Sequence, residues 1–156
     1  MSKIREKAVE GIRIGDTFRV TRTFTEDDTF QFADMTRDYN PVHFDDHFAK
    51  AKKLHERICH GFLVAGLITE IGGQIGWLAT DVRIRFKKAV YFGDTVTCVL
   101  TIINMDECGF AEAIIQMNNQ SGEVVIEAEL EGFLPVQEEE RRILAETAPP
   151  QTKRQN

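Results

Sequence analysis

The chain has few of the features that would place it in a membrane, in a disulfide framework or in a secretory pathway. No apolar run reaches the ~18 residues of a membrane span, because Gly66 and polar neighbours interrupt the longest one. The N-terminal segment lacks the hydrophobic core of a signal peptide, so we expect a cytoplasmic location and no membrane partner. The cysteines are odd in number and lack metal-ligand spacing, which favours reduced thiols: Cys59, Cys98 and Cys108.

Several functional classes are also without support. The net charge of −6 argues against a nucleic-acid partner. No G-x-G-x-x-G, P-loop or G-x-S-x-G motif is present. The four histidines lack carboxylate or cysteine partners at the spacing of a zinc site, so we expect no metal and no redox cofactor. With 156 residues and 42% hydrophobic residues, the chain is long enough to form one core.

Helices dominate the expected first half of the chain. Alternation over residues 17–24 predicts a half-buried strand. A helix should begin at Thr25 and stop before the Asn40-Pro41 corner, and Asp45 or Asp46 can cap a short helix over 47–53. Residues 61–75 predict a long helix whose apolar positions run nearly all round, so it should be buried on most sides.

From residue 81 onward, apolar residues recur at every second position, which is the period of a β-strand. Apolar residues alternate with polar ones over four segments, around 82–86, 95–102, 110–117 and 124–130. These strands predict an antiparallel meander. A long apolar helix followed by such a sheet indicates an α+β fold with the helix in the sheet's concave face. We expect one domain over 1–136, and a charged tail over 137–156 with a short helix followed by disorder.

The segment Asp38-Tyr39-Asn40-Pro41-Val42-His43 places an acid and an imidazole five residues apart across a proline. Pro41 fixes its own φ and pushes Asn40 out of the α region, so the chain forms a stiff corner. Asp38 and His43 could converge on one point from this corner. A loop with a capping aspartate is the plainer explanation, and taken alone this pattern does not exclude it.

The His60-Gly61 pair opens the most apolar run of the chain. A glycine in the first helical turn leaves an uncovered backbone N–H at the positive end of the helix dipole. The chain thus offers an acid, a base and a donor for a developing oxyanion. For His60 itself, a cap or a hydrogen-bonded core histidine is the expected role. Thr69 lies two helical turns after Gly61, where its hydroxyl either faces the same site or bonds back to a carbonyl.

Together these two segments resemble the MaoC-like dehydratases, which include the (R)-specific enoyl-CoA hydratases. D-x-N-P-x-H and the later H-G pair match position for position, and the resemblance resumes at 85–96 and covers roughly 10–135. Two positions depart from the pattern: Arg37 stands where a small residue is common, and Phe62 where Met is common.

The resemblance implies a hotdog fold, in which an antiparallel sheet wraps around a long central helix, and units that pair into homodimers or higher oligomers. It also implies reversible hydration of a 2-enoyl thioester, carried by coenzyme A or acyl carrier protein, to a (3R)-3-hydroxyacyl thioester. Asp38 and His43 are then the catalytic pair, in which either residue can be the acid or the base, and the Gly61 amide is the oxyanion donor. Asn40 and Thr69 orient or bind substrate. A hotdog thioesterase and a non-catalytic acyl-thioester-binding subunit remain the alternatives.

Overall fold

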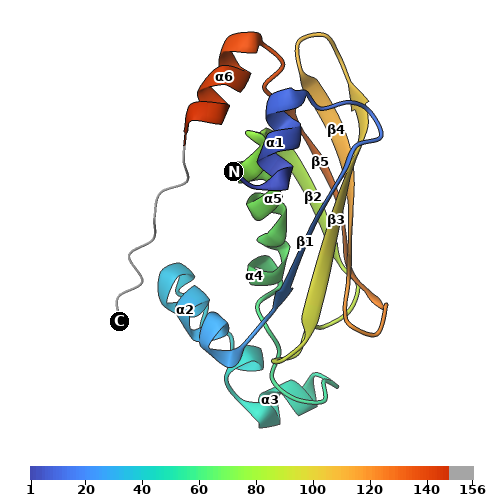
Figure 1. Ribbon diagram of the computed structural model, residues 1–156. Helices are drawn as coiled ribbons and strands as arrows, with labels where there is room; N and C mark the ends of the chain where they lie inside the picture. Colours follow the sequence, from blue (N-terminus) through green and yellow to red (C-terminus); the bar gives the residue numbers. More distant parts are fainter. Residues whose placement is uncertain (148–156) are drawn as a thin grey trace.

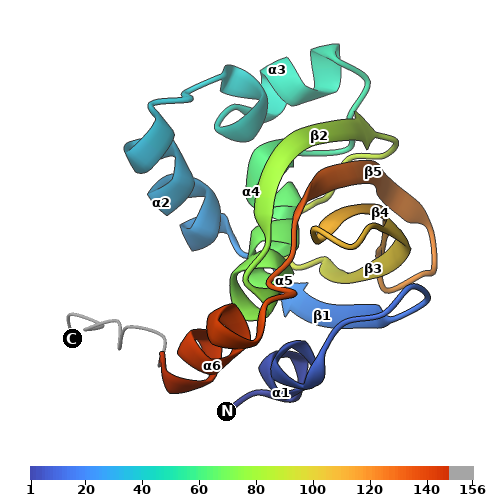
Figure 2. The ribbon, with the colours of Figure 1, turned by 90° about the horizontal axis from the view of Figure 1, so that it is seen from above.

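The computed structural model describes residues 1–147 and shows a curved five-stranded sheet with helices on its concave side and at both ends (Figures 1 and 2). The helices are α1 (Lys3–Glu10), α2 (Glu26–Thr36), the 3₁₀ turn η1 (Pro41–His43), α3 (Asp46–Ala51), α4 (Gly61–Ala65), α5 (Leu67–Ile75) and α6 (Glu138–Glu146). The strands are β1 (Thr17–Thr23), β2 (Leu78–Phe86), β3 (Thr95–Met105), β4 (Phe110–Asn118) and β5 (Val124–Phe133). The α+β class is therefore confirmed.

The strand order in the sheet is β1-β3-β4-β5-β2, and every neighbouring pair is antiparallel. The predicted meander is correct for β3, β4 and β5. It is wrong for β2, which pairs with β5 at the far edge and not with β3. Periodicity reports which face of a strand is buried and carries no information about its partner, so this crossover was not predictable from the pattern. β2 is thereby an edge strand beside the central helices.

The central helix is interrupted where the sequence predicts a continuous one. Helix α4 ends at Ala65 and α5 begins at Leu67, and Gly66 between them keeps a right-handed helical backbone. A Cβ atom at Gly66 would come within 2.9 Å of the Leu63 carbonyl oxygen, so this position needs a glycine. The expectation of burial on most sides is also wrong for one face, since Phe62 is 67% exposed.

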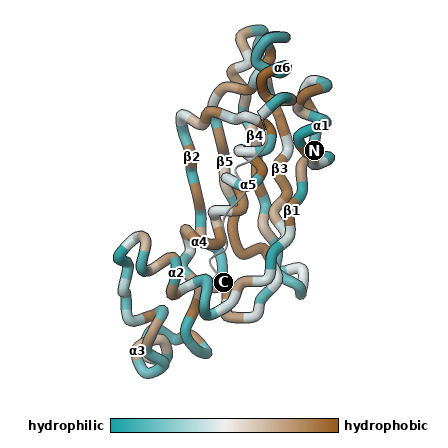
Figure 3. The backbone as a smooth tube through the Cα atoms, turned by 60° about the vertical axis from the view of Figure 1, so that its left-hand side comes forward, coloured by the Kyte–Doolittle hydropathy of each residue, from teal (hydrophilic) through white to brown (hydrophobic). Residues whose placement is uncertain are grey.

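The core lies between α5 and the concave face of the sheet. Buried residues of α5 meet the alternate buried residues of β3, β4 and β5, and these strands carry much of the hydrophobic colouring in Figure 3. The fully buried members that pack here are Leu67, Ile71, Ile75, Val96, Leu100, Ile102, Met117 and Ile126. Burial of such side chains stabilises the fold by roughly 1.5–3 kcal/mol each.

Helices α1 and α6 close the far end of the molecule. Helix α1 was not predicted from the sequence. Ser2 caps this helix, and its side-chain oxygen accepts from the Arg5 N–H at 3.1 Å. Arg5 donates to the carbonyl oxygens of Gly73 and Gln74 at the end of α5, and to those of Leu144 and Thr147 at the end of α6. Helix α6 stands where a short helix was predicted; the tail predicted to be disordered lies largely outside the described residues. Among the described helices none is long and apolar enough to cross a membrane; the cytoplasmic location stays a prediction.

Candidate active site

The Asp38–His43 corner is built by two local devices. Helix α2 ends at Arg37, whose backbone is left-handed at φ 60° and turns the chain out of the helix. Pro41 then opens η1, and the Asn40 side-chain oxygen caps this turn by accepting from the Val42 N–H at 3.2 Å. The corner therefore forms as predicted, with Asn40 as its cap. It lies at the same end of the molecule as α3 and the start of α4 (Figure 1).

His43 projects from this corner into the protein and is only 7% exposed. Its Nδ1 lies 2.8 Å from the Ile58 carbonyl oxygen. A carbonyl oxygen only accepts, so Nδ1 carries the proton and Nε2 is left with a free lone pair. Burial lowers the pKa of His43 from its ordinary value of 6.5, and His60 acts in the same direction, against the opposing effects of the Ile58 carbonyl and Asp38. A neutral imidazole at pH 7 is a competent proton acceptor.

Asp38 is half exposed beside His43. One carboxylate oxygen accepts from the Asn40 N–H at 3.2 Å, and the other lies 3.9 Å from His60 Nε2. One potential ligand atom each of Asp38, His43 and His60 lies within 4.8 Å of the others. The structure thus brings the predicted acid and imidazole together at one point, open to solvent on the Asp38 side.

His60 is the residue that sequence reasoning left out of the site. It is 2% exposed, and its ring stacks on that of His43 with 3.8 Å between centroids and 28° between planes. The expectation of a hydrogen-bonded core histidine is confirmed, because Nε2 lies 2.9 Å from the Asp38 carbonyl oxygen. His60 also occupies the N-cap position of α4, but its side chain makes no capping hydrogen bond to that helix.

Within residues 1–147, only Asp38, His43 and His60 form a group of three potential metal ligands. A metal ion lies in the plane of each imidazole that binds it, at about 2.0–2.1 Å for zinc. Two rings stacked 3.8 Å apart offer no nearby point in both planes. The Nε2 proton of His60 is also committed to a carbonyl oxygen. These three residues therefore fit a metal ion poorly.

Gly61 is the first residue of α4, as predicted. Its N–H donates no hydrogen bond to another described residue, so this amide remains available at the helix N-terminus. The ring of Phe86, from the edge strand β2, lies directly against Gly61: a Cβ atom there would come within 2.6 Å of the Phe86 Cε1 atom. This contact could not be predicted from the sequence, because Gly61 and Phe86 lie on separate elements.

Thr69 is not gathered with the other predicted site residues. Its hydroxyl donates to the Gly66 carbonyl oxygen at 2.7 Å, which is the back-bonding alternative, and its side chain is exposed. It lines an apolar hollow of about 270 Å³ together with Trp77 and Val82. A second hollow of about 340 Å³ includes Gly61 and Phe86, and Phe62 borders both. A substrate-binding role for Thr69 stays a prediction.

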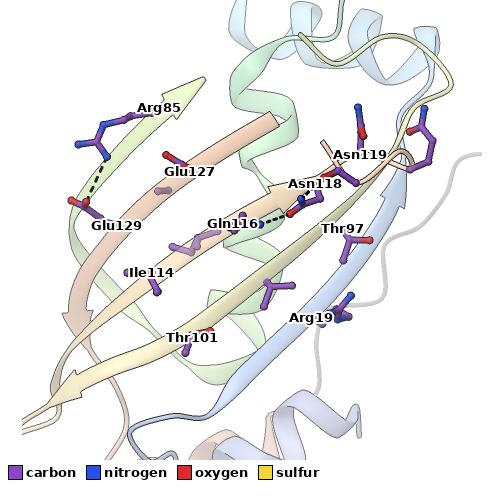
Figure 4. A pocket seen from close by; sticks show the side chains of 15 residues that line it. Arg19, Arg85, Thr97, Thr101, Ile114, Gln116, Asn118, Asn119, Glu127 and Glu129 are labelled. Atoms are coloured by element: carbon purple, nitrogen blue, oxygen red, sulfur yellow. Dashed lines mark hydrogen bonds and ion pairs between the residues drawn. The ribbon is translucent and has the colours of Figure 1, made fainter. Parts of the chain in front are cut away.

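A third hollow, of about 780 Å³ and larger than these two, lies elsewhere, on the outer face of the sheet (Figure 4). Its walls are side chains of the strands and of the turn after β4, among them Arg19, Thr97, Gln116 and Glu127. None of the five predicted site residues lines it. It is a shallow, polar surface separate from the acid–imidazole pair.

Residues 12–123 match the family model described as the MaoC like domain. The chain belongs to this family. The Asp38–His43 corner and the Gly61 helix start fall inside the matched region. The chain is 30% identical over 130 residues to an (R)-specific enoyl-CoA hydratase of Rhodospirillum rubrum, a match that covers 81% of this chain and 90% of that protein. A mitochondrial 3-hydroxyacyl-[acyl-carrier-protein] dehydratase of Arabidopsis thaliana is 28% identical over 132 residues, covering 80% and 78%.

Solved structures show the same architecture as this MaoC-like domain. The unliganded R-hydratase of Pseudomonas aeruginosa superposes with a TM-score of 0.75 at 26% identity, covering 83% of this chain and 86% of that one. The (R)-hydratase of Aeromonas caviae gives the same TM-score at 27% identity, covering 81% and 99%. The predicted hotdog fold is confirmed by the sheet wrapped around α5 and by these matches.

Proposed function

We propose that this MaoC-like domain adds water reversibly across the double bond of a 2-enoyl thioester, giving a (3R)-3-hydroxyacyl thioester. The observation that carries the proposal is the Asp38–His43 pair: a half-exposed carboxylate beside a buried imidazole whose Nε2 lone pair is free. The family and the named hydratase relatives support it. The 3R configuration rests on the relatives' names alone.

In the proposed mechanism, one water molecule is held between the Asp38 carboxylate and His43 Nε2. His43 takes a proton from this water as its oxygen bonds to C3 of the substrate. The electron pair of the C2=C3 double bond moves through C2 toward the thioester oxygen. The proton then passes from His43 to C2, which completes the addition of H and OH. General acid–base help of this kind typically contributes ~10²–10⁴-fold to the rate.

The thioester oxygen gains negative charge during this step and needs a donor. The Gly61 N–H stands at the first turn of α4 and donates to no other described residue. Glycine also has no Cβ atom that would hold the thioester oxygen away. Loss of an oxyanion donor typically costs about 2.7–4 kcal/mol. The Asn40 side chain holds the corner, so it orients the pair without taking part in proton transfer.

The substrate in this proposal is an acyl thioester of coenzyme A or of acyl carrier protein, as in the names of the relatives. No separate cofactor is needed, because the thioester itself activates C3 and coenzyme A is part of the substrate. The apolar hollows beside Phe62 offer space for an acyl chain.

The test follows loss of the conjugated enoyl-thioester absorbance with crotonyl-CoA and longer substrates, with free thiol measured in the same samples. We expect hydration without thiol release. Thiol release at a comparable rate with no hydration would instead establish the thioesterase alternative. Cys59 is no candidate nucleophile for that reaction, because burial raises its pKa to about 12. Binding of the thioester with neither reaction would establish the non-catalytic subunit.

We further propose that two copies pair through the β2 edge and the neighbouring face of α4. The support is an apolar surface, left open by the single chain, on which four large side chains are 49–69% exposed: Phe62 at 67%, Leu78 at 69%, Val82 at 49% and Phe86 at 51%. Strand β2 pairs only with β5 in the described chain, so its other edge is free to contact a partner.

A further inference from the structure

His60 makes two specific contacts, one to each member of the proposed catalytic pair. Its Nε2 lies 2.9 Å from the Asp38 carbonyl oxygen, and because that oxygen only accepts, Nε2 carries the ring proton. Its ring stacks on His43 at 3.8 Å. His60 also immediately precedes Gly61, so the same residue joins the acid, the imidazole and the oxyanion donor.

Two further aromatic rings lie near the His60 ring. Phe32 of α2 lies 5.0 Å away between centroids, and Phe44, which follows η1, lies 6.1 Å away. The ring is thus enclosed on several sides, and only the contact with Asp38 is polar. The titratable groups that face His43 in this cluster are Asp38, on the segment after α2, and His60 at the start of α4.

Packing alone does not explain a histidine here. The Nδ1 atom of His60 is buried and has no hydrogen-bond partner among the described residues. Leaving a buried polar atom without a partner costs more free energy than a neutral hydrogen bond such as that from Nε2 contributes. An aromatic hydrocarbon would fill the space without this cost. What it would lose is the bond to the Asp38 main chain.

We propose that His60 is a positioning residue, which fixes the Asp38 main chain through its Nε2–H and holds the His43 ring in place by stacking. The proposal rests on the hydratase function above. The stacked ring also keeps water from one face of His43, and burial is the main cause that lowers the pKa of His43. His60 therefore helps to keep His43 neutral and ready to accept a proton.

Two variants separate the two contacts. His60→Gln keeps an N–H donor that can reach the Asp38 carbonyl but removes the ring. His60→Phe keeps a ring that stacks on His43 but removes the donor. His47→Gln is the matched control, because His47 is exposed. Each variant is examined by NMR titration of its histidines, by its hydratase pH profile and by its thermal unfolding.

With His60→Gln we expect the His43 titration midpoint to rise by about half a pH unit or more, because water reaches the uncovered ring. The acid limb of the kcat/KM profile should move upward by the same amount. With His60→Phe the midpoint should move less, while kcat on the plateau falls by ~10–10²-fold with a smaller change in KM, because Asp38 is displaced. The control should match the wild type in all three measurements.

Two results would overturn the proposal. One is a folded pair of variants with the wild-type midpoint and wild-type kcat. The other is a pair of variants that unfold at a lower Tm but whose folded fraction keeps the wild-type His43 midpoint and kcat. His60 would then be a packing residue. If only His60→Gln folds, it still tests the stacking on His43. If only His60→Phe folds, it still tests the hydrogen bond to the Asp38 carbonyl. A wild-type protein that hydrates no enoyl thioester would refute the proposed function, and the NMR midpoint would still test whether His60 holds His43.

Discussion

The ring of Phe86 lies so close to Gly61 that a Cβ atom at residue 61 would come within 2.6 Å of its Cε1 atom. Phe86 is half exposed on the edge strand β2, and it also meets Phe62 edge-on at 5.8 Å. A glycine at this position lets a thioester oxygen approach the backbone amide, because no Cβ atom is in the way. The structure adds a second requirement, since the glycine also leaves room for the Phe86 ring.

The first prediction separates these two requirements. Gly61→Ala should lower kcat by ~10²-fold, because the methyl group obstructs the oxygen and displaces Phe86. The double variant Gly61→Ala with Phe86→Ala removes the clash with the ring and leaves the obstruction of the oxygen. We expect the double variant to stay impaired relative to Phe86→Ala alone in the crotonyl-CoA assay. Full recovery would show that glycine is needed only for packing.

The second prediction concerns the acid and the imidazole themselves. Asp38→Asn and His43→Ala should each lower kcat by ~10²–10⁴-fold with little change in fold. The asparagine keeps an oxygen that can accept from the Asn40 N–H, so the corner is retained. His47→Ala provides the matched exposed control. A folded variant that kept more than about a tenth of the wild-type turnover would remove that residue from the mechanism.

How much of this site the sequence predicts depends on how local each contact is. The corner is set by Asn40 and Pro41, which act within five residues, and it forms as expected. The stacking of His60 on His43 joins residues 17 positions apart through the packing of α4 beneath the corner. No spacing rule relates them, so His60 was predicted only as a cap or core histidine.

In the fold, too, local features were predicted from the sequence and contacts between distant segments were not. The strand periods locate β3, β4 and β5, because each buries one face against α5. The pairing of β2 with β5 and the placement of Phe86 over Gly61 depend on how the chain returns from α5. A Cβ atom at Gly66 would approach the Leu63 carbonyl oxygen, and a hydrophobic pattern does not record this contact. Helix α1 is short and polar, so its cap at Ser2 was the only local signal.

The third prediction is the pH dependence of the reaction. His43 acts as a base only when neutral, and burial lowers its pKa below 6.5. The acid limb of kcat/KM should therefore have its midpoint below pH 6.5. The same shift should lower the free energy of unfolding as the pH falls from 6.5 toward the folded-state pKa, because the unfolded chain binds the proton first. A kcat/KM profile with its acid midpoint at or above 6.5 would contradict the base role of a buried His43.

The fourth prediction tests the strain at the end of α2. Arg37 has a left-handed backbone at φ 60°, a conformation that costs an L-residue more than it costs glycine. Arg37→Gly should raise the free energy of unfolding by about 0.5–1 kcal/mol, which corresponds to a Tm increase of ~1–4 °C. Lys50→Gly, in the right-handed last turn of α3, should instead lower stability by up to about 1 kcal/mol. Equal effects of the two glycines would show that the φ of Arg37 carries no strain.

The last prediction tests the pairing of two copies and uses two residues of equal exposure. Val82 on β2 and Ile114 on β4 are both 49% exposed, but Val82 borders the hollow beside α5 and Ile114 lies on the outer face of the sheet. Val82→Asp should convert dimers into monomers, because an unpaired carboxylate buried in an interface costs several kcal/mol. Ile114→Asp should leave the dimer intact. Sedimentation equilibrium over a range of concentrations measures both, and thermal unfolding confirms that each variant is folded. Dissociation by Ile114→Asp alone would move the interface to the outer face, and a wild-type monomer at high concentration would refute the pairing.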